Sequence, residues 1–298
     1  MRSSPAEARP SAPRRLYAGG VDVGSAFTKA VILAGPAGAA AALEPAAAAE
    51  FAARAQILGR GAAKTGVAME KAARAALEQA CEQAGLDDAE LDYIAATGLG
   101  RYSIGFRNIQ ITEITSDACG AHFLFPGART LLDIGSQSTR AIGLSETGRV
   151  HQFKTNDKCA AGSGSFIVRA ARYLQIPLEA AGELALEADQ PQPISSICAV
   201  LAESEIINHV SAGATVPNIL AGIYDSLADR SALLLKRVAA AEAVVLVGGV
   251  AHQRGAVRAL ERRLKIPVQV PENCEYTGAL GAGLLGLRRA AAAAGATA

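Results

Sequence analysis

Two short motifs, each an Asp, one intervening residue, a Gly and a Ser, carry side chains suited to phosphate chemistry. They occupy residues 22–25 (DVGS) and 133–136 (DIGS). An Asp at the end of a strand can hold a hydrated Mg²⁺ ion, and the Gly lets backbone N–H groups approach phosphate oxygens closely. The Ser hydroxyl adds a donor at the same place. Each motif therefore predicts a contact with a magnesium-bound phosphate.

The two motifs have similar surroundings, which indicates an internal repeat. Residues 17–33 and 129–144 each run from an apolar strand through the motif into a second strand that carries Thr and a basic residue. A repeat of this kind predicts two lobes of like construction. In the first copy the basic residue is Lys29, which either neutralises phosphate charge or is a solvated lysine at a strand end. The sequence favours neither interpretation.

A third glycine-bearing strand follows in the second half of the chain. The run AVVLVGGVA at 243–251 predicts a buried strand that ends in Gly248 and Gly249. One interpretation is a turn that needs a positive φ, and the other is close approach of the backbone to the base and ribose of a nucleotide. The sequence has neither a Walker A motif nor a G-x-G-x-x-G after the first strand, which excludes P-loop and Rossmann sites.

Predicted strands and helices alternate around Gly turns, which is typical of an α/β fold with sheets covered on both faces. Besides the strands already described, helices are expected at 61–85, 163–174, 198–211, 217–238, 254–264 and 277–289, and strands at 91–100 and 266–271. The expected division is a tail at 1–15, a first lobe at 16–130 completed by the helix at 278–290, a second lobe at 131–277, and a tail at 291–298.

Length and composition restrict the class of protein. The 298 residues are half hydrophobic with a formal net charge of +1, which is enough to bury a full core and gives no reason to expect nucleic acid or a membrane surface as partner. No apolar run approaches the ~20 residues of a membrane helix, and residues 1–15 lack the apolar block of a secretory signal. Five scattered cysteines argue against a disulfide framework, so we expect a reducing, cytoplasmic location.

Two of the cysteines precede expected helices and are candidates for metal binding. Cys159 lies just before the Gly-rich start of the helix at 163–174, and Cys198 follows a Ser pair that can cap the next helix. The positive end of a helix favours thiolate, which iron or zinc requires. Two thiolates are half the set of a [4Fe–4S] cluster, so a dimer would complete it; the alternative is that both are small buried residues. Cys119, His122 and His209 are interpreted as structural, and Cys81 and Cys274 as cysteines without a metal-binding partner nearby in the sequence.

The order of two Asp-x-Gly-Ser hairpins and a later Gly-Gly strand resembles the superfamily of acetate kinase, sugar kinases, Hsp70 and actin, over residues 17–290. The resemblance implies two related lobes around a cleft in which the hairpins clamp the phosphates of ATP and the Gly-Gly strand supports the adenosine. The residues that it places in this cleft are Asp22, Gly24, Ser25, Asp133, Gly135, Ser136, Gln137, Gly248 and Gly249. Gln137 is the preferred residue to orient the attacking water. Glu113 is the second candidate and otherwise caps or pairs within its strand.

The surroundings of the two candidate cysteines carry a narrower resemblance. NDKCAAGSGSF (156–166) and CAVLAESEIINHVSAG (198–213) closely resemble motifs of the ATPase family that includes the 2-hydroxyacyl-CoA dehydratase activators and the ATPase subunits of ATP-dependent benzoyl-CoA reductase. The resemblance implies that Cys159 and Cys198 ligate one [4Fe–4S] cluster shared with a second ATPase subunit, either a copy or a paralogue. It also implies a ferredoxin-type electron donor and catalytic subunits that receive the electron.

Within that family, segments 97–115 and 172–213 look more like the benzoyl-CoA reductase branch. Ser116 and Cys119 stand where the family is expected to have Cys and Arg, and Ser138 replaces an Asp of the dehydratase activators. A dehydratase activator is the nearest alternative. A cluster-free kinase of a sugar or acid, and an actin- or chaperone-like ATPase, are the alternatives without redox chemistry.

Overall fold

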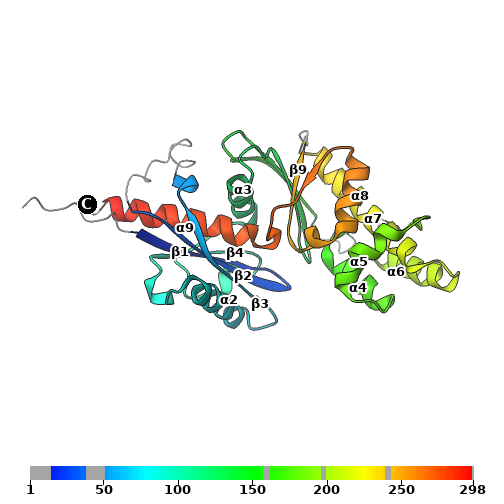
Figure 1. Cartoon of the computed structure of the whole chain (residues 1–298), viewed down its shortest axis with the longest axis horizontal. Coiled ribbons are helices and arrows are strands. Elements are labelled where there is room, and N and C mark those ends of the chain that lie inside the picture. Colours follow the sequence, from blue (N-terminus) through cyan, green and yellow to red (C-terminus); the bar gives the residue numbers. More distant parts are fainter. Residues whose placement is uncertain (1–14, 38–50, 157–161, 196–198, 239–242, 297–298) are drawn as a thin grey trace, which may run out of the picture.

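Each Asp-x-Gly-Ser motif lies at the tip of an antiparallel hairpin, and each hairpin belongs to a separate five-stranded sheet (Figure 1). The computed structural model describes residues 15–37, 51–156, 162–195, 199–238 and 243–296. The first sheet contains β1 (Arg15–Val23), β2 (Phe27–Pro36), β3 (Gln56–Lys64), β4 (Tyr93–Thr97) and β5 (Ile109–Gln110). The second contains β6 (Thr130–Ile134), β7 (Thr139–Leu144), β8 (Val150–Asn156), β9 (Val244–Val247) and β10 (Val268–Gln269).

The two sheets have the same topology. Their strand orders are β3-β2-β1-β4-β5 and β8-β7-β6-β9-β10. In each sheet three antiparallel strands come first, and two further strands then add in parallel beside the first strand of the hairpin. The structure therefore confirms the predicted α/β class and shows that the repeat read from the hairpins extends to the whole sheet.

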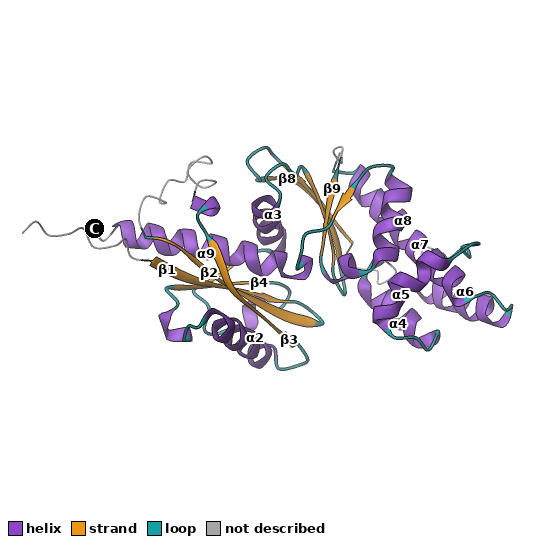
Figure 2. Ribbon diagram, viewed as in Figure 1, coloured by secondary structure: helices purple, strands orange, loops and turns teal. Residues whose placement is uncertain are grey.

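Helices cover both faces of each sheet (Figure 2). The α-helices are α2 (Met69–Ala84), α3 (Glu113–Leu124), α4 (Gly164–Tyr173), α5 (Leu178–Leu184), α6 (Ala199–Ser211), α7 (Val216–Lys236), α8 (Arg254–Leu264) and α9 (Thr277–Ala296). Short 3₁₀ turns are η1 (Asp88–Glu90), η2 (Arg101–Ser103), η4 (Ala185–Glu187), η5 (Gly249–His252) and η6 (Cys274–Tyr276). None of the helices in these ranges is long and apolar enough to span a membrane.

Each sheet is covered on one face by a helix from outside its own run of strands. Helix α3 precedes the second sheet in the chain yet packs on it through Ala118 and Ala121. Helix α9 follows the second sheet yet packs on the first through Leu280 and Leu284. The opposite faces are covered by α2 on the first sheet and by helices of the α4–α8 segment on the second. Helix α3 directly precedes the central strand β6 of its sheet, whereas α9 lies far in the sequence from the strands of the first sheet that it covers.

Glycines allow α3 and α9 to cross in direct backbone contact. A Cβ atom on Gly281 would lie 1.8 Å from the carbonyl oxygen of Ser116, and one on Gly120 would lie 2.2 Å from that of Thr277. Real Cβ atoms do not approach so closely, so larger residues would push the helices apart. The contact brings the starts of α3 and α9 together between the sheets.

One expected helix is partly wrong. Residues 61–85 were expected to be helical throughout, but β3 ends at Lys64 and α2 begins only at Met69. Strand β3 packs closely under the helix, because a Cβ on Gly61 would lie 2.0 Å from the carbonyl oxygen of Ala76. The end of α2 is as expected, since Gly85 has a left-handed φ of 68° and caps it. Helices α4, α6, α7, α8 and α9 correspond to the other expected helices.

Candidate functional site

The two hairpins place an acidic residue opposite a basic one at the same register position. Asp22 of β1 faces Lys29 of β2, and Asp133 of β6 faces Arg140 of β7. Facing residues of antiparallel strands have Cα atoms about 4.5–5.5 Å apart, so the backbone alone brings each pair together. An acidic and a basic residue at facing positions of the hairpin are therefore part of the internal repeat.

The second pair extends into an ion-pair network. Arg140 lies 2.5 Å from Asp133 Oδ2 and 2.5 Å from Glu113 Oε1. Glu113 also pairs with Arg101 at 3.1 Å, and Arg101 donates a hydrogen bond of 2.9 Å to the carbonyl oxygen of Gly98. The chain of contacts runs from a strand of the second sheet, through the start of α3, to the turn that follows β4 of the first sheet. It therefore joins the two sheets.

The expectation that Glu113 lies in a strand is wrong, because it is the first residue of α3. Thr112 is the N-cap of this helix, and its hydroxyl oxygen accepts a hydrogen bond of 3.3 Å from the N–H of Thr115. Glu113 thus lies at the positive end of a helix, where a carboxylate is favoured. Its two arginine partners make Glu113 the link between Arg101 and Arg140 in the ion-pair network.

The first acid–base pair is looser. Lys29 Nζ lies 3.9 Å from Asp22 Oδ2, and both side chains stay partly accessible. A Cβ on Gly24 would lie 3.4 Å from the same Nζ and 2.7 Å from the carbonyl oxygen of Phe27. Glycine is therefore required at this tip, and the Lys29 ammonium group lies beside it. That position suits the phosphate-neutralising interpretation of Lys29.

A glycine presses against each hairpin aspartate. Gly98 follows β4 with φ of 88°, and Gly248 follows β9 with φ of 86°. A Cβ on Gly98 would lie 2.4 Å from Asp22 Oδ1, and one on Gly248 would lie 2.5 Å from Asp133 Oδ1. The positive φ predicted as one interpretation of Gly248 is confirmed. Gly249 is exposed, and a Cβ there would have nothing within 4 Å.

A third aspartate joins the site from α3. Asp117 is 7 % exposed, and its Oδ2 has no hydrogen-bond partner among the described residues. A Cβ on Gly278, at the start of α9, would lie 2.9 Å from Asp117 Oδ1 and 3.3 Å from Asp22 Oδ2. Asp22 and Asp117 thus approach the same point, near the starts of α3 and α9.

The electrostatics of the site follow from this crowding of carboxyl groups. Burial, together with the negative charge of Asp133, raises the pKa of Asp117 well above its usual value. Burial also raises the pKa of Asp133, although Arg140 opposes the change. For Arg140 itself, burial acts to lower the pKa, but the surrounding carboxylates outweigh it and raise the pKa above its usual value. The site carries acidic groups that a bound cation would stabilise.

The tips of the hairpins differ in exposure. Ser25 and Gln137 are exposed, whereas Gly135 and Ser136 are half-buried. The N–H of Gly135 donates a hydrogen bond of 2.9 Å to the carbonyl oxygen of Ser138, which closes the second tip. Each tip therefore presents at least one exposed polar side chain.

The second tip is also bonded to the start of α4. The N–H of Gly164 donates to the carbonyl oxygen of Gly135 at 2.9 Å, and that of Ser165 to Ser136 at 2.8 Å. Just before the helix, the carbonyl oxygen of Gly162 accepts a hydrogen bond from the Thr139 hydroxyl of β7. The hairpin and the residues that precede α4 therefore form one hydrogen-bonded unit.

Cys159 and Cys198, the predicted metal ligands, lie outside the described residues. Of the other cysteines, Cys81 and Cys119 agree with a packing role, because burial raises the pKa of each thiol to about 11. Cys274 differs from the expectation, since Glu275 and His252 both lie next to its sulfur.

The predicted site lacked four residues that the structure adds. The internal repeat in the sequence indicates Arg140 and Gly98, because they stand at the positions that match Lys29 and Gly248. Asp117 had a weaker signal, as it lies one helical turn after Glu113. Arg101 had none, since its ion pair with Glu113 depends on how the turn after β4 packs against the start of α3.

The donors fit a magnesium-bound phosphate. Carboxylate oxygens are the ligands that Mg²⁺ prefers, and Asp22, Asp133 and the unpartnered Asp117 oxygen supply them. The Lys29 ammonium group at one tip carries a charge opposite to that of a phosphate. The glycine turns leave room for the backbone to approach an anion.

Comparison with known proteins gives a consistent result. Residues 20–286 match the BadF/BadG/BcrA/BcrD ATPase family. An activator of lactoyl-CoA dehydratase from Anaerotignum propionicum is 40% identical over 269 residues, which cover 90% of this chain and 96% of that protein. One of the subunits of benzoyl-CoA reductase from Thauera aromatica is 43% identical over 225 residues, which cover 74% of this chain and 79% of that protein.

Solved structures show the same relationship. The activator of 2-hydroxyisocaproyl-CoA dehydratase from Clostridium difficile, solved with bound ADPNP, has a TM-score of 0.81 at 34% identity and covers 92% of this chain and 96% of its own. A ROK family glucokinase from Streptomyces griseus has a TM-score of 0.50 at 15% identity and covers 91% and 99%. The second likeness shows the fold alone, and confirms the sugar-kinase-like architecture predicted from the hairpin order.

Proposed function

This chain belongs to the BadF/BadG/BcrA/BcrD ATPase family, and we propose that it couples ATP hydrolysis to the transfer of a low-potential electron. In this proposal Cys159 and Cys198 of two subunits hold one [4Fe–4S] cluster. The electron comes from a ferredoxin-type donor and goes to the catalytic subunits of an aromatic acyl-CoA reductase, of the benzoyl-CoA type. The family implies ATP and Mg²⁺ as the nucleotide and its ion.

The hydrogen bonds between the second hairpin and the start of α4 are the observation that carries this proposal. Gly162, Gly164 and Ser165 bond to the hairpin and are among the first described residues after Cys159. A displacement of the tip by the γ-phosphate would therefore be transmitted to the segment that carries Cys159. A kinase that only transfers phosphate has no need of a thiol at that place.

The nucleotide chemistry is assigned to side chains of the two hairpins. Asp22 and Asp133 hold the hydrated Mg²⁺, and Lys29 neutralises phosphate charge. Because the transition state of phosphoryl transfer is stabilised mainly by positioning and charge, these groups need no covalent role. Gln137, exposed at the second tip, orients the attacking water. Glu113 forms ion pairs with Arg101 and Arg140, so its role is to position Arg140.

The remaining residues proposed for the nucleotide are glycines and serines. Gly24 and Gly135 let the backbone of the two tips approach the phosphates, with the hydroxyls of Ser25 and Ser136 beside them. Gly248 and Gly249 support the adenosine. A [4Fe–4S] cluster, when bound, supplies storage of one electron at low potential.

A dehydratase activator is the second candidate function. It is favoured by the lactoyl-CoA dehydratase activator, which this chain matches over 96% of that protein, against 79% for the benzoyl-CoA reductase relative. Copurification separates the two candidates. An ATPase of the reductase type is expected to purify with a paralogous ATPase and catalytic subunits, whereas an activator is expected to purify as a homodimer.

The proposed function is tested by anaerobic purification, iron and sulfide analysis, and electron paramagnetic resonance after reduction with dithionite. We expect about four irons per dimer and a reduced-cluster signal that is lost in Cys159→Ser but kept in Cys119→Ser. ATP hydrolysis is expected to fall about 100-fold or more in Gln137→Ala, with the cluster signal unchanged. Iron-free protein after anaerobic preparation would contradict the electron-transfer function and favour a plain kinase.

A further inference from the structure

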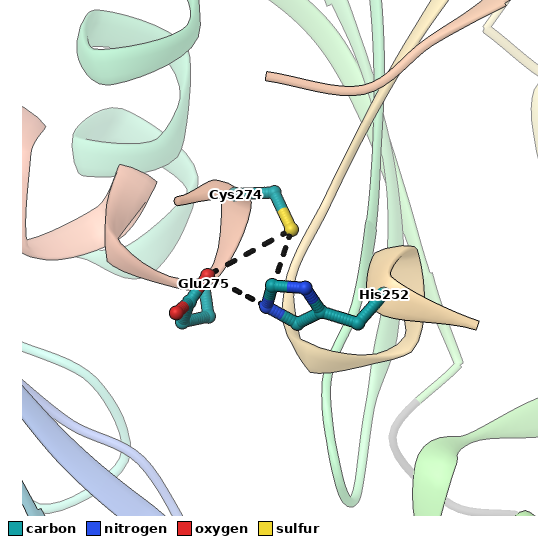
Figure 3. A group of neighbouring side chains, drawn as sticks. All are labelled: His252, Cys274 and Glu275. Carbon is teal, nitrogen blue, oxygen red and sulfur yellow. Dashed lines mark hydrogen bonds and ion pairs between the residues drawn. The ribbon is translucent and has the colours of Figure 1, made fainter. Parts of the chain in front are cut away.

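Three side chains of metal-binding type converge at the turn after β9 (Figure 3). His252 ends η5, and Cys274 and Glu275 open η6. The Cys274 sulfur lies 3.7 Å from His252 Nε2 and 3.8 Å from Glu275 Oε2, and the nitrogen lies 2.7 Å from the same oxygen. One nitrogen, one sulfur and one oxygen donor thus face a common point.

We propose that His252, Cys274 and Glu275 bind a single Zn²⁺ ion. Zinc bonds of about 2.0–2.3 Å in a tetrahedron place neighbouring ligand atoms about 3.3–3.6 Å apart. The two distances from sulfur, 3.7 and 3.8 Å, need to shorten by only a few tenths of an ångström. The nitrogen–oxygen distance of 2.7 Å is that of a hydrogen bond, and it opens when the ion takes the place of the shared proton.

The ligand set determines which ion fits. A thiolate and an imidazole select zinc over the hard ions Mg²⁺ and Ca²⁺, which take oxygen ligands. Iron–sulfur clusters are held almost entirely by thiolates, so one Cys with His and Glu does not suit them. Three protein ligands leave a fourth position for water or another donor.

One ligand of the site is buried and held in place by the backbone, and the other two are accessible to solvent. Cys274 is 1 % exposed, whereas the side chain of His252 is 54 % exposed and that of Glu275 is 25 % exposed. The carbonyl oxygen of Cys274 accepts hydrogen bonds from the N–H of Gly248 at 3.2 Å and from the Thr277 hydroxyl at 2.9 Å. The backbone therefore holds the sulfur in place, while the imidazole can move aside to admit an ion.

The position of the site gives the ion a structural consequence. His252 follows the Gly248–Gly249 turn of the second sheet, whereas Cys274 and Glu275 directly precede α9, which packs on the first sheet. An ion bound by all three residues would tie the turn after β9 to the segment that crosses between the lobes. The site is independent of Cys159 and Cys198, and the inference does not depend on the proposed function.

The inference is tested by metal titration of the full chain, prepared metal-free with a chelator. The background carries Cys159→Ser and Cys198→Ser, so that neither thiolate contributes. Co²⁺ serves as the optical probe, because a cobalt–thiolate bond gives a charge-transfer band and a tetrahedral site gives strong visible bands. The affinity for Zn²⁺ is measured by competition with a chromophoric chelator.

We expect one Co²⁺ per chain with both spectral features, displaced by one Zn²⁺. Cys274→Ser should abolish the charge-transfer band, and His252→Ala should weaken zinc binding by more than the roughly 10- to 100-fold that loss of an outer-shell partner costs. Glu275→Gln is nearly isosteric and keeps the fold if the other two variants do not. Cys81→Ser, which removes a buried thiol in α2, is the matched control and should bind as the parent does.

Failure to bind Co²⁺ or Zn²⁺ in competition with the chelator would overturn the inference. Stoichiometric binding that Glu275→Gln and Cys274→Ser leave unchanged would overturn it as well, because the ion would then lie elsewhere. Both results leave the iron content and ATP hydrolysis of the natural chain untouched, so they are distinct from a failure of the proposed function.

Discussion

The hairpins of the two lobes share a backbone but differ in how their charges are used. Asp22 and Lys29 stand 3.9 Å apart, whereas Asp133 and Arg140 are 2.5 Å apart, and Arg140 also binds Glu113. The repeat thus fixes where an acid and a base stand. Glu113 makes the difference between the two pairs, because it also binds the basic residue of the second hairpin. The first hairpin keeps its basic residue available for a ligand, whereas Arg140 of the second hairpin joins the lobes through Glu113.

The largest expected effect comes from removing the basic residue of each hairpin. Arg140→Met leaves Asp133 and Glu113 as poorly paired carboxylates, and breaking a buried ion pair from one side typically costs about 3–5 kcal/mol. Lys29→Met, the matched change, removes a longer contact, for which about 0–1 kcal/mol is expected. Denaturant unfolding without nucleotide measures both. Equal losses in the two variants would contradict the difference between the hairpins.

The glycines behind the aspartates should behave alike in both lobes. Gly98→Ala and Gly248→Ala each force a side chain into positive φ and against a carboxylate, which is expected to cost at least about 1–3 kcal/mol. Gly249→Ala meets nothing within 4 Å and should stay within about 0.5 kcal/mol. Thermal unfolding of the three variants tests this. If only one of the two glycines tolerates Ala, the equivalent turns after β4 and β9 do not impose the same constraint.

The pH dependence of stability should report the buried carboxyl between the hairpins. Because burial raises the pKa of Asp117 above its unfolded value near 3.8, the folded state holds the proton longer than the unfolded state does. Its contribution to stability is present below that pH and is lost as the pH rises through the folded pKa. Each unit of the rise corresponds to about 1.4 kcal/mol.

Asp117→Asn removes this loss, so the free energy of unfolding of the variant should gain on that of the natural chain as the pH rises above about 4. Denaturant unfolding at a series of pH values measures the difference between the two proteins. A difference that does not change with pH would show that Asp117 ionises as it does in the unfolded chain. Mg²⁺ with nucleotide should reduce the difference if the ion favours the carboxylate.

The smallest expected effect comes from removing a threonine hydroxyl group near the tip of each hairpin. Thr28 shares a hydrogen bond of 3.0 Å with Thr65, and Thr139 donates to Gly162 before α4. Thr28→Val and Thr139→Val should each cost about 1 kcal/mol in stability. Only Thr139→Val is expected to lower electron transfer per ATP hydrolysed, because it loosens the connection between hairpin and helix. The same coupling ratio in both variants would contradict that connection.

The structural features that depend on residues close together in the chain could be predicted from the sequence. The hairpins, their Asp-x-Gly-Ser tips and the Gly248 turn were predicted because alternating apolar residues and glycines give local signals. Helix α3 was missed, since it is buried between α9 and the second sheet and shows no single apolar stripe. The start of α2 was misplaced because the small residues of β3 also fit a helical spacing. The roles of Arg101 and of Asp117 require the placement of both sheets, which no short stretch of sequence encodes.

The packing of α9 on the first sheet has a consequence for the order in which the parts of the protein can fold during synthesis. The first sheet contains residues from Arg15 onward, but the helix that covers one of its faces begins only at Thr277. Chains leave the ribosome from the N-terminus at about 5–20 residues per second. During translation of the second half, the apolar side chains that α9 later covers, such as Leu16 and Leu33, have no native partner from that helix. The strands of the first sheet must therefore wait for α9, and chaperones have that interval in which to act.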